Sequence, residues 1–420
     1  MMNKDELLKI QNQINSLNLP EFNGINIGKA LTYNILGFEP KNILYELKAI
    51  IAPFIKFRYK IIKNQGNIVF LWGSSTAKRK DHEIKFDNIA NTVTDSTIIK
   101  DDCSQSFIIN PFLIFKLLKF LFICRKLSVK KIFARNIAYW LFFSYCQLEQ
   151  FKSLYENYLK NKKLICVWCD VLPSDYIAVE FFKSKGIKTV TLQHAEFNPG
   201  LLEGNLAYTN SLSDYFICFG KHASKLAQTA GLTSDKLLEF GNPEFVGKKL
   251  PQKMDSKKTG FFGLSLSYID FKEENINLLK IASLISEFTG LKCFIRQHPS
   301  LNMPDYSEFI NNKDFEFKDK KESMDKFIER IEFVVLGLSN VYISMIMKLI
   351  PVFRMQLPNS SDQYSDINFS TFSDIEVFKE LYTKFKNEPS FMEKNMIGAR
   401  VYLNSDDSLR KYREFFEKFK

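Results

Sequence analysis

Three short polar motifs in the second half of the chain carry residue types that handle phosphate groups. They are Gln193-His194-Ala195-Glu196, Gly241-Asn242-Pro243-Glu244 and Arg296-Gln297-His298-Pro299-Ser300. Each motif follows an apolar run typical of a buried strand, so we expect each in the loop that leaves a strand. In an open α/β sheet, ligands bind at the carboxyl ends of the strands. These loops therefore place basic, acidic and amide side chains where a phosphate-bearing ligand would be held.

The third motif and a later segment offer side chains for an anionic leaving group. His298 can donate a hydrogen bond or a proton to a phosphate, and Arg296 can supply charge beside it. Ser339 and Asn340 precede an apolar, helix-like run, so either can cap a helix whose free N–H groups bind an anion. Arg354, after a predicted strand at 351–353, is a further candidate for a phosphate or sugar contact.

The elements that would position these motifs alternate between strand and helix. Apolar runs alternate with helical patterns from residue 164, and the alternation restarts at residue 260 after a polar, basic stretch at 246–258. Such alternation predicts parallel sheets with right-handed crossovers. A chain of 420 residues is also long for one hydrophobic core. We predict an α/β protein of two doubly wound, Rossmann-like domains that face a cleft.

The expected domain boundaries follow from the same pattern. The first domain covers 1–247 and begins with a mainly helical part over residues 1–65, and the second covers 259–400. The last segment, 401–420, is predicted as a helix that can pack back on the first domain. A buried strand at 67–72 is followed by Gly73 and Ser74, a small-residue loop whose backbone N–H groups can bind a ligand.

The composition favours anionic partners. The chain has 58 Lys and Arg against 47 Asp and Glu, a net charge of +11. No nucleic-acid-binding motif is visible, so nucleic acid is not an expected partner. The N-terminus has no apolar run typical of a signal peptide, and the seven cysteines form no framework. Reduced thiols fit a cytoplasmic protein.

The most membrane-like stretch covers 107–124, and a basic cluster extends it to 131. Lys116 and Lys119 interrupt this stretch, and its length is near the lower limit for a spanning helix. Two interpretations remain open. The segment 107–131 either makes a peripheral contact with anionic lipid on the inner face of the cell membrane, or forms a buried helix with a solvated basic end.

The two-domain layout and its motifs resemble glycosyltransferases of the two-Rossmann-domain type, usually called GT-B. The likeness covers roughly residues 165–356 and is greatest to bacterial enzymes of capsule and lipopolysaccharide synthesis. His298-Pro299 with Ser300 looks like the His-Pro motif of bacterial sialyltransferases and polysialyltransferases, and Ser339-Asn340 looks like their Ser-rich motif. Their acidic motif has only an imperfect match in His194-Ala195-Glu196 with Gly200.

The resemblance implies a metal-independent, inverting glycosyltransferase. It would move a sugar from a nucleotide donor, with CMP-sialic acid favoured, to a bacterial surface polysaccharide or lipooligosaccharide. Asp101-Asp102 and Asp406-Asp407 lie in polar stretches away from predicted strand ends. We therefore expect no catalytic metal and no cofactor, the nucleotide sugar being a substrate.

Other functions remain open at this point. The same motifs are similar to those of UDP-sugar 2-epimerases and of the CDP-polyol phosphotransferases of teichoic-acid synthesis. A transferase that uses a UDP-sugar is a further variant. From a different class, the chain could be a non-catalytic subunit of a capsule-assembly complex that binds a nucleotide without turning it over.

A transferase of this kind needs a general base for the acceptor hydroxyl, and His194 and Glu196 are the candidates. An imidazole titrates near neutral pH, whereas a glutamate needs burial to raise its pKa. The residues alone leave the choice open. Asp170, at the end of a predicted strand at 164–169, is a second carboxylate at the same sheet edge, with helix capping as the alternative role.

Four residues outside these roles are interpreted more simply. Gly241 and Asn242 form a turn at the domain boundary, where a hinge is favoured over a ligand contact. His222 opens a predicted helix and is interpreted as structural or near the base. His82 lies in a charged loop and is expected to be solvated.

Overall fold

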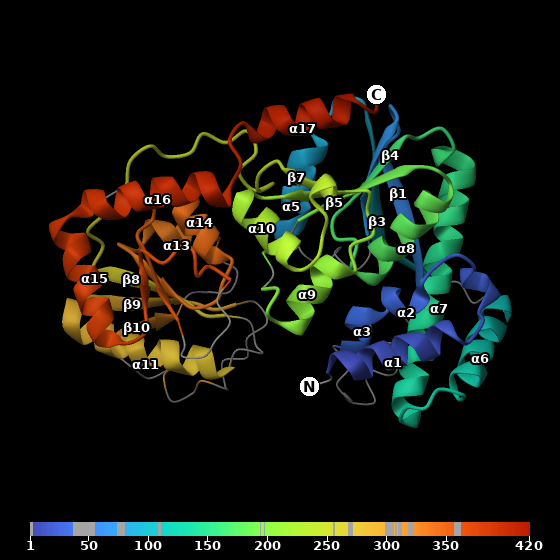
Figure 1. Cartoon of the computed structure of the whole chain (residues 1–420), viewed down its shortest axis with the longest axis horizontal. Helices are drawn as coiled ribbons and strands as arrows, with labels where there is room; N and C mark the ends of the chain where they lie inside the picture. Colours follow the sequence, from blue (N-terminus) through green and yellow to red (C-terminus); the bar gives the residue numbers. More distant parts are fainter. Residues whose placement is uncertain are drawn as a thin grey trace. The chain divides into compact units, whose positions relative to one another are not determined.

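The structure, a computed structural model, describes residues 3–36, 55–73, 80–107, 111–193, 195–196, 198–254, 257–267, 272–298, 306, 309, 313–317, 323–356 and 363–420. Of the predicted site residues, Ser74, His194, Pro299 and Ser300 lie outside this described part. The chain forms two compact units (Figure 1). Unit 1 comprises Met1–Gly247 with Ser405–Lys420, and unit 2 comprises Lys248–Asn404.

Unit 1 is built on one sheet with the strand order β1-β3-β2-β4-β5-β6-β7 within the described residues. Neighbouring strands run parallel except β1 and β3, which are antiparallel. From β3 onward the order is that of a flavodoxin-like doubly wound sheet, and it reverses between β2 and β4. The strands are β1 (Ile55–Lys63), β2 (Ile68–Trp72), β3 (Ser96–Phe107), β4 (Leu164–Val167), β5 (Lys188–Leu192), β6 (Tyr215–Cys218) and β7 (Leu237–Glu239).

Helices cover both faces of this sheet. The central strands β2 and β4 are buried along their whole length, so their apolar runs do not alternate with polar residues. The helices are α1 (Lys4–Asn15), η1 (Pro20–Phe22), α2 (Ile27–Ala30), α3 (Thr32–Leu36), α5 (Lys80–Ala90), α6 (Pro111–Cys124), α7 (Lys131–Leu154), η3 (Tyr155–Leu159), α8 (Pro173–Ser184), α9 (Leu202–Thr209), α10 (Lys221–Thr229) and η4 (Ser234–Lys236).

The side chains of each central strand divide between two hydrophobic cores. Val69 of β2 faces a core built with α7 and α8, whereas Phe70 faces a core built with α5 and the C-terminal helix. That helix, α17 (Ser408–Glu417), belongs to unit 1 and contributes Tyr412, Phe415 and Phe416 to the second core (Figure 1). The end of the chain therefore completes the first unit.

Unit 2 contains a fully parallel sheet with the order β10-β9-β8-β11-β12-β13 within the described residues. Numbered along the chain this is 3-2-1-4-5-6, the order of the Rossmann dinucleotide-binding sheet, and it reverses between β8 and β11. Its elements are β8 (Phe261–Ser265), α11 (Lys272–Thr289), β9 (Lys292–Arg296), β10 (Phe315–Phe317), α13 (Met324–Glu329), β11 (Val334–Leu336), α14 (Val341–Met347), β12 (Val352–Met355), β13 (Thr371–Phe372), α15 (Ile375–Asn387) and α16 (Pro389–Leu403).

One sequence prediction in unit 1 is wrong, because residues 55–63 form strand β1 instead of continuing a helical part. Strand β3, which contains Asp101 and Asp102 away from its ends, was not predicted. Many polar residues of β3 have partners on neighbouring elements. Nζ of Lys100, for example, lies 2.8 Å from Oε1 of Glu83 in α5. Because polar residues interrupt β3, the strand does not appear in the sequence as an apolar run.

The membrane-like stretch forms α6, which begins at Pro111 and has 14 residues. A helix of this length rises about 21 Å, short of the roughly 30 Å of a bilayer core. Across the described ranges, no helix combines the length and the apolarity that a membrane span requires.

Candidate functional site

A buried acidic–histidine pair lies beyond the carboxyl ends of β5 and β6. Glu196 follows β5, and His222 lies in the first turn of α10, directly after β6. Oε2 of Glu196 is 3.6 Å from Nε2 of His222, and both side chains are at most 1 % exposed. The structure thus pairs Glu196, a candidate base, with His222, which the sequence left as either structural or near the base.

Gln193 fixes the start of the loop that carries Glu196. Its Nε2 donates a hydrogen bond to the carbonyl oxygen of Ala195 at 2.9 Å. Its Oε1 accepts one from the backbone N–H of Phe219, just after β6, also at 2.9 Å. These two hydrogen bonds join the loop after β5 to the loop after β6. They hold the carboxylate of Glu196 beside the imidazole of His222, and a carboxylate in such a position stabilises positive charge on the ring.

At the strand-order reversal of unit 1, a carboxylate presses against a glycine. A Cβ at Gly73, after β2, would lie 1.9 Å from Oδ1 of Asp175 in the first turn of α8. Oδ2 of Asp175 accepts the backbone N–H of Cys169 at 3.0 Å. Burial raises the pKa of Asp175 to about 7. Gly73, predicted to offer its backbone to a ligand, is instead buried and packed against this side chain.

Unit 2 repeats this arrangement with different residues. A Cβ at Gly337, after β11, would lie 2.1 Å from Oε1 of Glu274 in the first turn of α11. The same oxygen accepts hydrogen bonds from Oγ of Ser267 at 2.6 Å and from the backbone N–H of Leu338 at 3.0 Å. Burial raises the pKa of Glu274. The carboxylate therefore joins the loops after β8 and β11.

Both carboxylates lie where open α/β sheets bind their ligands. A carboxylate and a phosphate repel each other, so we expect phosphate groups to bind beside these two contacts rather than in place of them. Asp175 and Glu274 were missed in the sequence analysis. The available signal was an acidic residue in the first turn of a helix that follows a buried strand, a position that the helix dipole favours for a negative charge.

Ser339 and Asn340 lie in the loop that Glu274 holds. Asn340 is the N-cap residue of α14 and makes no side-chain capping hydrogen bond, while the Oγ of Ser339, one residue earlier, accepts the backbone N–H of Val341 at 3.3 Å. The Oδ1 of Asn340 accepts the hydroxyl of Tyr364 at 3.2 Å. The N–H of Leu338, just before these two residues, donates to Glu274. The phosphate-binding role of Ser339 and Asn340 stays a prediction.

Arg354 differs most from its prediction. It lies inside β12 rather than after it, and it is fully buried. Nη2 donates to Oγ1 of Thr371 at 2.9 Å and to the carbonyl oxygen of Tyr364 at 3.5 Å, and the guanidinium lies 5.5 Å from the ring centre of Tyr342. Arg354 is in register with Leu336 of the neighbouring strand β11, and helix α14 packs against both strands. Its position is that of an interior cation, enclosed by protein, rather than of an open phosphate contact.

Arg296 and His298 lie at the carboxyl end of β9. Arg296 is the last residue of the strand, in register with Ser265 of β8, and its carbonyl oxygen accepts the N–H of Leu266 at 3.0 Å. Both Arg296 and His298 are half-buried. They keep the strand-end position that the sequence predicts, and their ligand-binding roles stay predictions.

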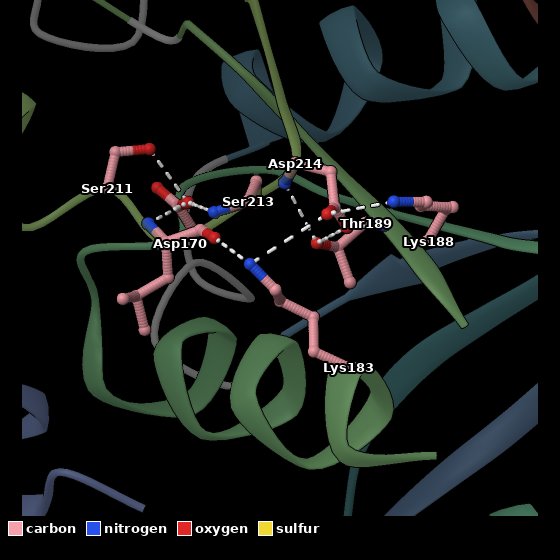
Figure 2. Close-up of polar contacts among 8 residues, drawn as sticks. Asp170, Lys183, Lys188, Thr189, Ser211, Ser213 and Asp214 are labelled. Atoms are coloured by element: carbon pink, nitrogen blue, oxygen red, sulfur yellow. Dashed lines mark hydrogen bonds and ion pairs between the residues drawn. The ribbon is translucent and has the colours of Figure 1, made fainter. Parts of the chain in front are cut away.

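Asp170 is held inside unit 1 by the segment before β6 (Figure 2). One oxygen, Oδ2, accepts the hydroxyl of Ser211 at 2.8 Å and the backbone N–H groups of Leu212 and Ser213 at 2.9 and 2.8 Å. Burial raises the pKa of Asp170. The residue is 1 % exposed and caps this segment, instead of presenting a carboxylate at the open sheet edge.

The same segment is fixed next to Asp170 by a second set of contacts (Figure 2). Oδ2 of Asp214 accepts the N–H and the hydroxyl of Thr189 at 2.9 and 3.0 Å. Lys183 donates to the carbonyl oxygen of Leu212 at 2.7 Å and lies 3.9 Å from Asp214. These contacts give the network around Asp170 a structural role in joining β4, β5 and β6.

Gly241 and Asn242 belong to a turn fixed to unit 1. Gly241 has φ +109°, a conformation that favours glycine, and its carbonyl oxygen accepts the hydroxyl of Tyr412 at 3.0 Å. Oδ1 of Asn242 accepts the N–H of Glu244 at 2.9 Å, and Glu244 pairs with Lys85 of α5 at 2.9 Å. Asn242 thus acts as a turn residue, and its predicted binding role stays a prediction.

His82 is a half-buried residue of α5 rather than a solvated loop residue. Nε1 of Trp168 donates to its Nδ1 at 3.3 Å, and the two ring centres are 5.4 Å apart. Among the residues that the structure describes, no three His, Cys, Asp or Glu side chains are grouped as metal ligands would be.

Asp175 predicts a stability that falls with rising pH. Its pKa of about 7 in the folded chain exceeds the unfolded value of roughly 4. Between these values the folded state holds a proton that the unfolded state has lost, so the free energy of unfolding decreases by on the order of 1 kcal/mol per pH unit. We expect Asp175→Asn to remove this slope. Urea unfolding followed by tryptophan fluorescence measures it in unit 1, which contains all three tryptophans.

Glu180 provides the control for this measurement. Burial raises its pKa to about 6, so Glu180→Gln is expected to flatten the slope only below pH 6 and to leave the range from 6 to 7 unchanged. A slope between pH 6 and 7 that persists in Asp175→Asn would show that another group carries it.

No protein-family model matches the chain, and no curated protein matches its sequence. Solved structures match it at low identity. S. aureus MnaA, solved with UDP, has a TM-score of 0.54 at 12 % identity and covers 84 % of this chain and 98 % of its own. The UDP-GlcNAc 2-epimerase of Methanocaldococcus jannaschii has a TM-score of 0.51 at 13 % identity, covering 83 % and 99 %.

A glycotransferase of kitacinnamycin also matches, with a TM-score of 0.52 at 9 % identity and coverage of 85 % of this chain and all of the other. At such identities the likeness concerns the fold. The predicted fold class is confirmed: this chain has the two-domain α/β fold with parallel-sheet, Rossmann-like domains that GT-B glycosyltransferases and UDP-GlcNAc 2-epimerases share.

Proposed function

We propose that the protein is a nucleotide-sugar enzyme, and specifically a metal-independent, inverting glycosyltransferase with a glycan or glycolipid acceptor. The observation that carries the proposal is the placement of ionisable side chains at the carboxyl ends of parallel strands in both units. Unit 1 places Glu196 and His222 there, and unit 2 places Arg296 and His298. The fold neighbours support it, since they include a glycotransferase, S. aureus MnaA solved with UDP, and a UDP-GlcNAc 2-epimerase.

The chemistry assigns complementary roles to these groups. The oxygen of an acceptor hydroxyl attacks the anomeric carbon of the donor, and the bond from that carbon to the phosphate oxygen breaks with its electron pair on the phosphate. Arg296 stabilises the added charge, and His298 donates a hydrogen bond or a proton to the leaving nucleotide. The proton of the acceptor passes to a base in the loop after β5.

We assign that base to His194 rather than to Glu196. The carboxylate of Glu196 is fully enclosed by protein and lies beside His222, which suits a positioning residue better than a group that touches the acceptor. An imidazole also titrates near neutral pH without the help of burial. In this proposal the Glu196–His222 pair and Gln193 hold the loop in place while His194 takes the proton.

Two observations bear on the donor nucleotide. The resemblance of His298-Pro299 and Ser339-Asn340 to sialyltransferase motifs implies CMP, whereas the neighbouring structures are named for UDP and UDP-GlcNAc. We therefore place UDP and CMP first among the donors to be tested, and CDP tests the polyol phosphotransferase variant.

The second candidate function is a UDP-sugar 2-epimerase. The specific observation in its favour is that two of the neighbours described above are MnaA bound to UDP and a UDP-GlcNAc 2-epimerase. An epimerase changes the configuration of the sugar at C2 without any acceptor. NMR of UDP-GlcNAc incubated with the protein alone separates the two functions, because a transferase leaves C2 unchanged and needs an acceptor for turnover.

A thermal-shift titration with CMP, CDP, UDP and GDP tests the nucleotide site. A ligand that binds only the folded state stabilises it by about 2.7 kcal/mol at roughly 100 times its Kd. We expect one nucleotide class to raise the melting temperature of the wild type and to lose this effect in His298→Ala. Lys292→Ala is the matched control, because Lys292 is exposed and begins the same strand, β9.

Each outcome of the titration has a definite meaning. A shift with UDP alone removes the CMP-sialic acid donor, and a shift with CMP alone removes the UDP-sugar donor and the epimerase. Binding without turnover of any nucleotide sugar assigns the chain to a non-catalytic subunit. The absence of a shift with all four nucleotides contradicts the proposed function.

A further inference from the structure

Helix α6 turns an apolar face away from unit 1. Phe115 and Phe122 are 70 % and 65 % exposed, and Phe112 and Leu118 are exposed by more than half. The opposite side of the helix packs into the core through Leu117, Phe120 and Cys124. A surface helix of a soluble protein normally has a polar face toward solvent. In α6 the face opposite the core is made of large apolar side chains.

The orientation of this face is fixed by a buried acid. Glu21 of η1 accepts hydrogen bonds from Nζ of Lys116 at 2.8 Å and of Lys119 at 2.5 Å. Burial alone would raise the pKa of Glu21, but these two hydrogen bonds outweigh it and lower the pKa to about 2. The single carboxylate holds both lysines toward the protein and offsets one of their two positive charges. Rotation of α6 to hide Phe112, Phe115 and Phe122 would break both contacts.

The surroundings of the apolar face are strongly basic. No Asp or Glu occurs in the sequence between Asp102 and Glu149. The turn between α6 and α7, together with the first residue of α7, carries exposed basic residues that form no ion pair within the described part of the chain, namely Arg125, Lys126, Lys130 and Lys131. An apolar stripe edged by unpaired cations has the chemistry of a helix that lies in the headgroup region of an anionic bilayer.

We propose that the outer face of α6, with the basic turn that follows it, docks on an anionic lipid bilayer. Phe112, Phe115, Leu118 and Phe122 would enter the boundary between headgroups and acyl chains, and the basic turn would contact lipid phosphates. In Figure 1, α6 runs along the outside of unit 1 next to α7. This inference stands independently of the proposed function.

Charge complementarity selects lipid over a protein partner. The core of a typical protein–protein interface is depleted in charge, with lysine in particular under-represented, whereas this face continues directly into a cluster of lysines. The length of α6 also fits a helix that lies on a membrane, because 14 residues can lie in the plane of the lipid–water interface but cannot cross the bilayer. The structure thus favours the membrane-contact interpretation of segment 107–131 over the buried-helix interpretation.

Sedimentation of the full chain with lipid vesicles tests the proposal. We expect the wild type to bind vesicles that contain phosphatidylglycerol and not vesicles of pure phosphatidylcholine. The double variant Phe115→Ser with Phe122→Ser should partition at least roughly ten-fold less, because two large apolar side chains no longer enter the bilayer. Lys130→Gln with Lys131→Gln should lose about five-fold per charge removed, and high salt should mimic that loss.

Ile84→Ser is the matched control, since Ile84 is an exposed isoleucine of unit 1 on a different helix, α5. Melting temperatures of all variants show whether folding is preserved. Failure of the wild type to bind anionic vesicles, or equal binding by the phenylalanine variant, overturns the proposal. Light scattering tests whether the face instead binds a second copy of the chain. That assignment follows if the wild type is a dimer that does not bind vesicles and the Phe115→Ser, Phe122→Ser variant is a monomer.

Discussion

Replacing His194 by Ala is expected to lower kcat by about 10² to 10⁴-fold, the contribution typical of a general base. The rate of a histidine-dependent enzyme rises with pH through a pKa near 6.5, so the acidic limb of the pH–rate profile should disappear in this variant. Steady-state kinetics with the nucleotide sugar selected by the thermal-shift titration measure both effects.

Glu196→Gln tests the positioning role in the same assay. The glutamine keeps the side-chain volume and removes the charge that lies 3.6 Å from His222. We expect a smaller loss of kcat than in His194→Ala, with the acidic limb of the pH–rate profile displaced but present. The reverse ranking, with a profile that depends on Glu196 alone, would assign the base to Glu196 and contradict our choice.

Arg354→Ala is expected to destabilise unit 2 by about 3–5 kcal/mol. The substitution removes a buried cation, removes the hydrogen bond that Arg354 donates to Oγ1 of Thr371, and leaves the buried Glu274 without the positive charge that lowers its pKa. Cys293 is a specific probe, because it is buried in β9 and is the one cysteine in the sequence of residues 248–404. Labelling of its thiol in increasing urea reports the unfolding of unit 2.

Two further variants place bounds on the Arg354 result. Arg330→Ala removes an arginine from the surface of unit 2, and we expect a loss of at most about 1 kcal/mol. Arg354→Met keeps much of the side-chain volume and should cost less than alanine. If Arg354→Ala instead weakened nucleotide binding and left the unfolding of unit 2 unchanged, the predicted phosphate contact would stand and the interior role would be wrong.

Much of the fold is predictable because its signals are local. The strand–helix alternation predicted from residue 164, and again from residue 260, is found in the structure, for example in helix α10 and strand β9. Short, fully buried strands in parallel sheets appear as unbroken apolar runs, and the helices between them keep a helical repeat. Strands β1 and β3 were not predicted because they mix polar and apolar residues. Strand β13 was not predicted because it has only two residues.

The candidate site was only partly predictable. The sequence placed Arg296 and His298 at a strand end, where the structure finds them. It gave no indication that Arg354 would be enclosed by protein. It also did not indicate that the carboxylate of Asp170 would accept hydrogen bonds from Ser211, Leu212 and Ser213. Polar residue type and position after a strand are the same for a ligand contact and for an interior contact. The number of neighbours that enclose the side chain separates the two cases.

By itself, the sequence determined the alternation of strands and helices, the two-domain organisation and the apolar, basic character of segment 107–131. Only the tertiary structure brought Asp175 against Gly73 and Glu274 against Gly337, and turned Phe112, Phe115 and Phe122 of α6 outward. Periodicity along the chain records which residues are buried. Strand order and helix packing decide which distant residues meet, and those contacts depend on neighbours far away in the sequence.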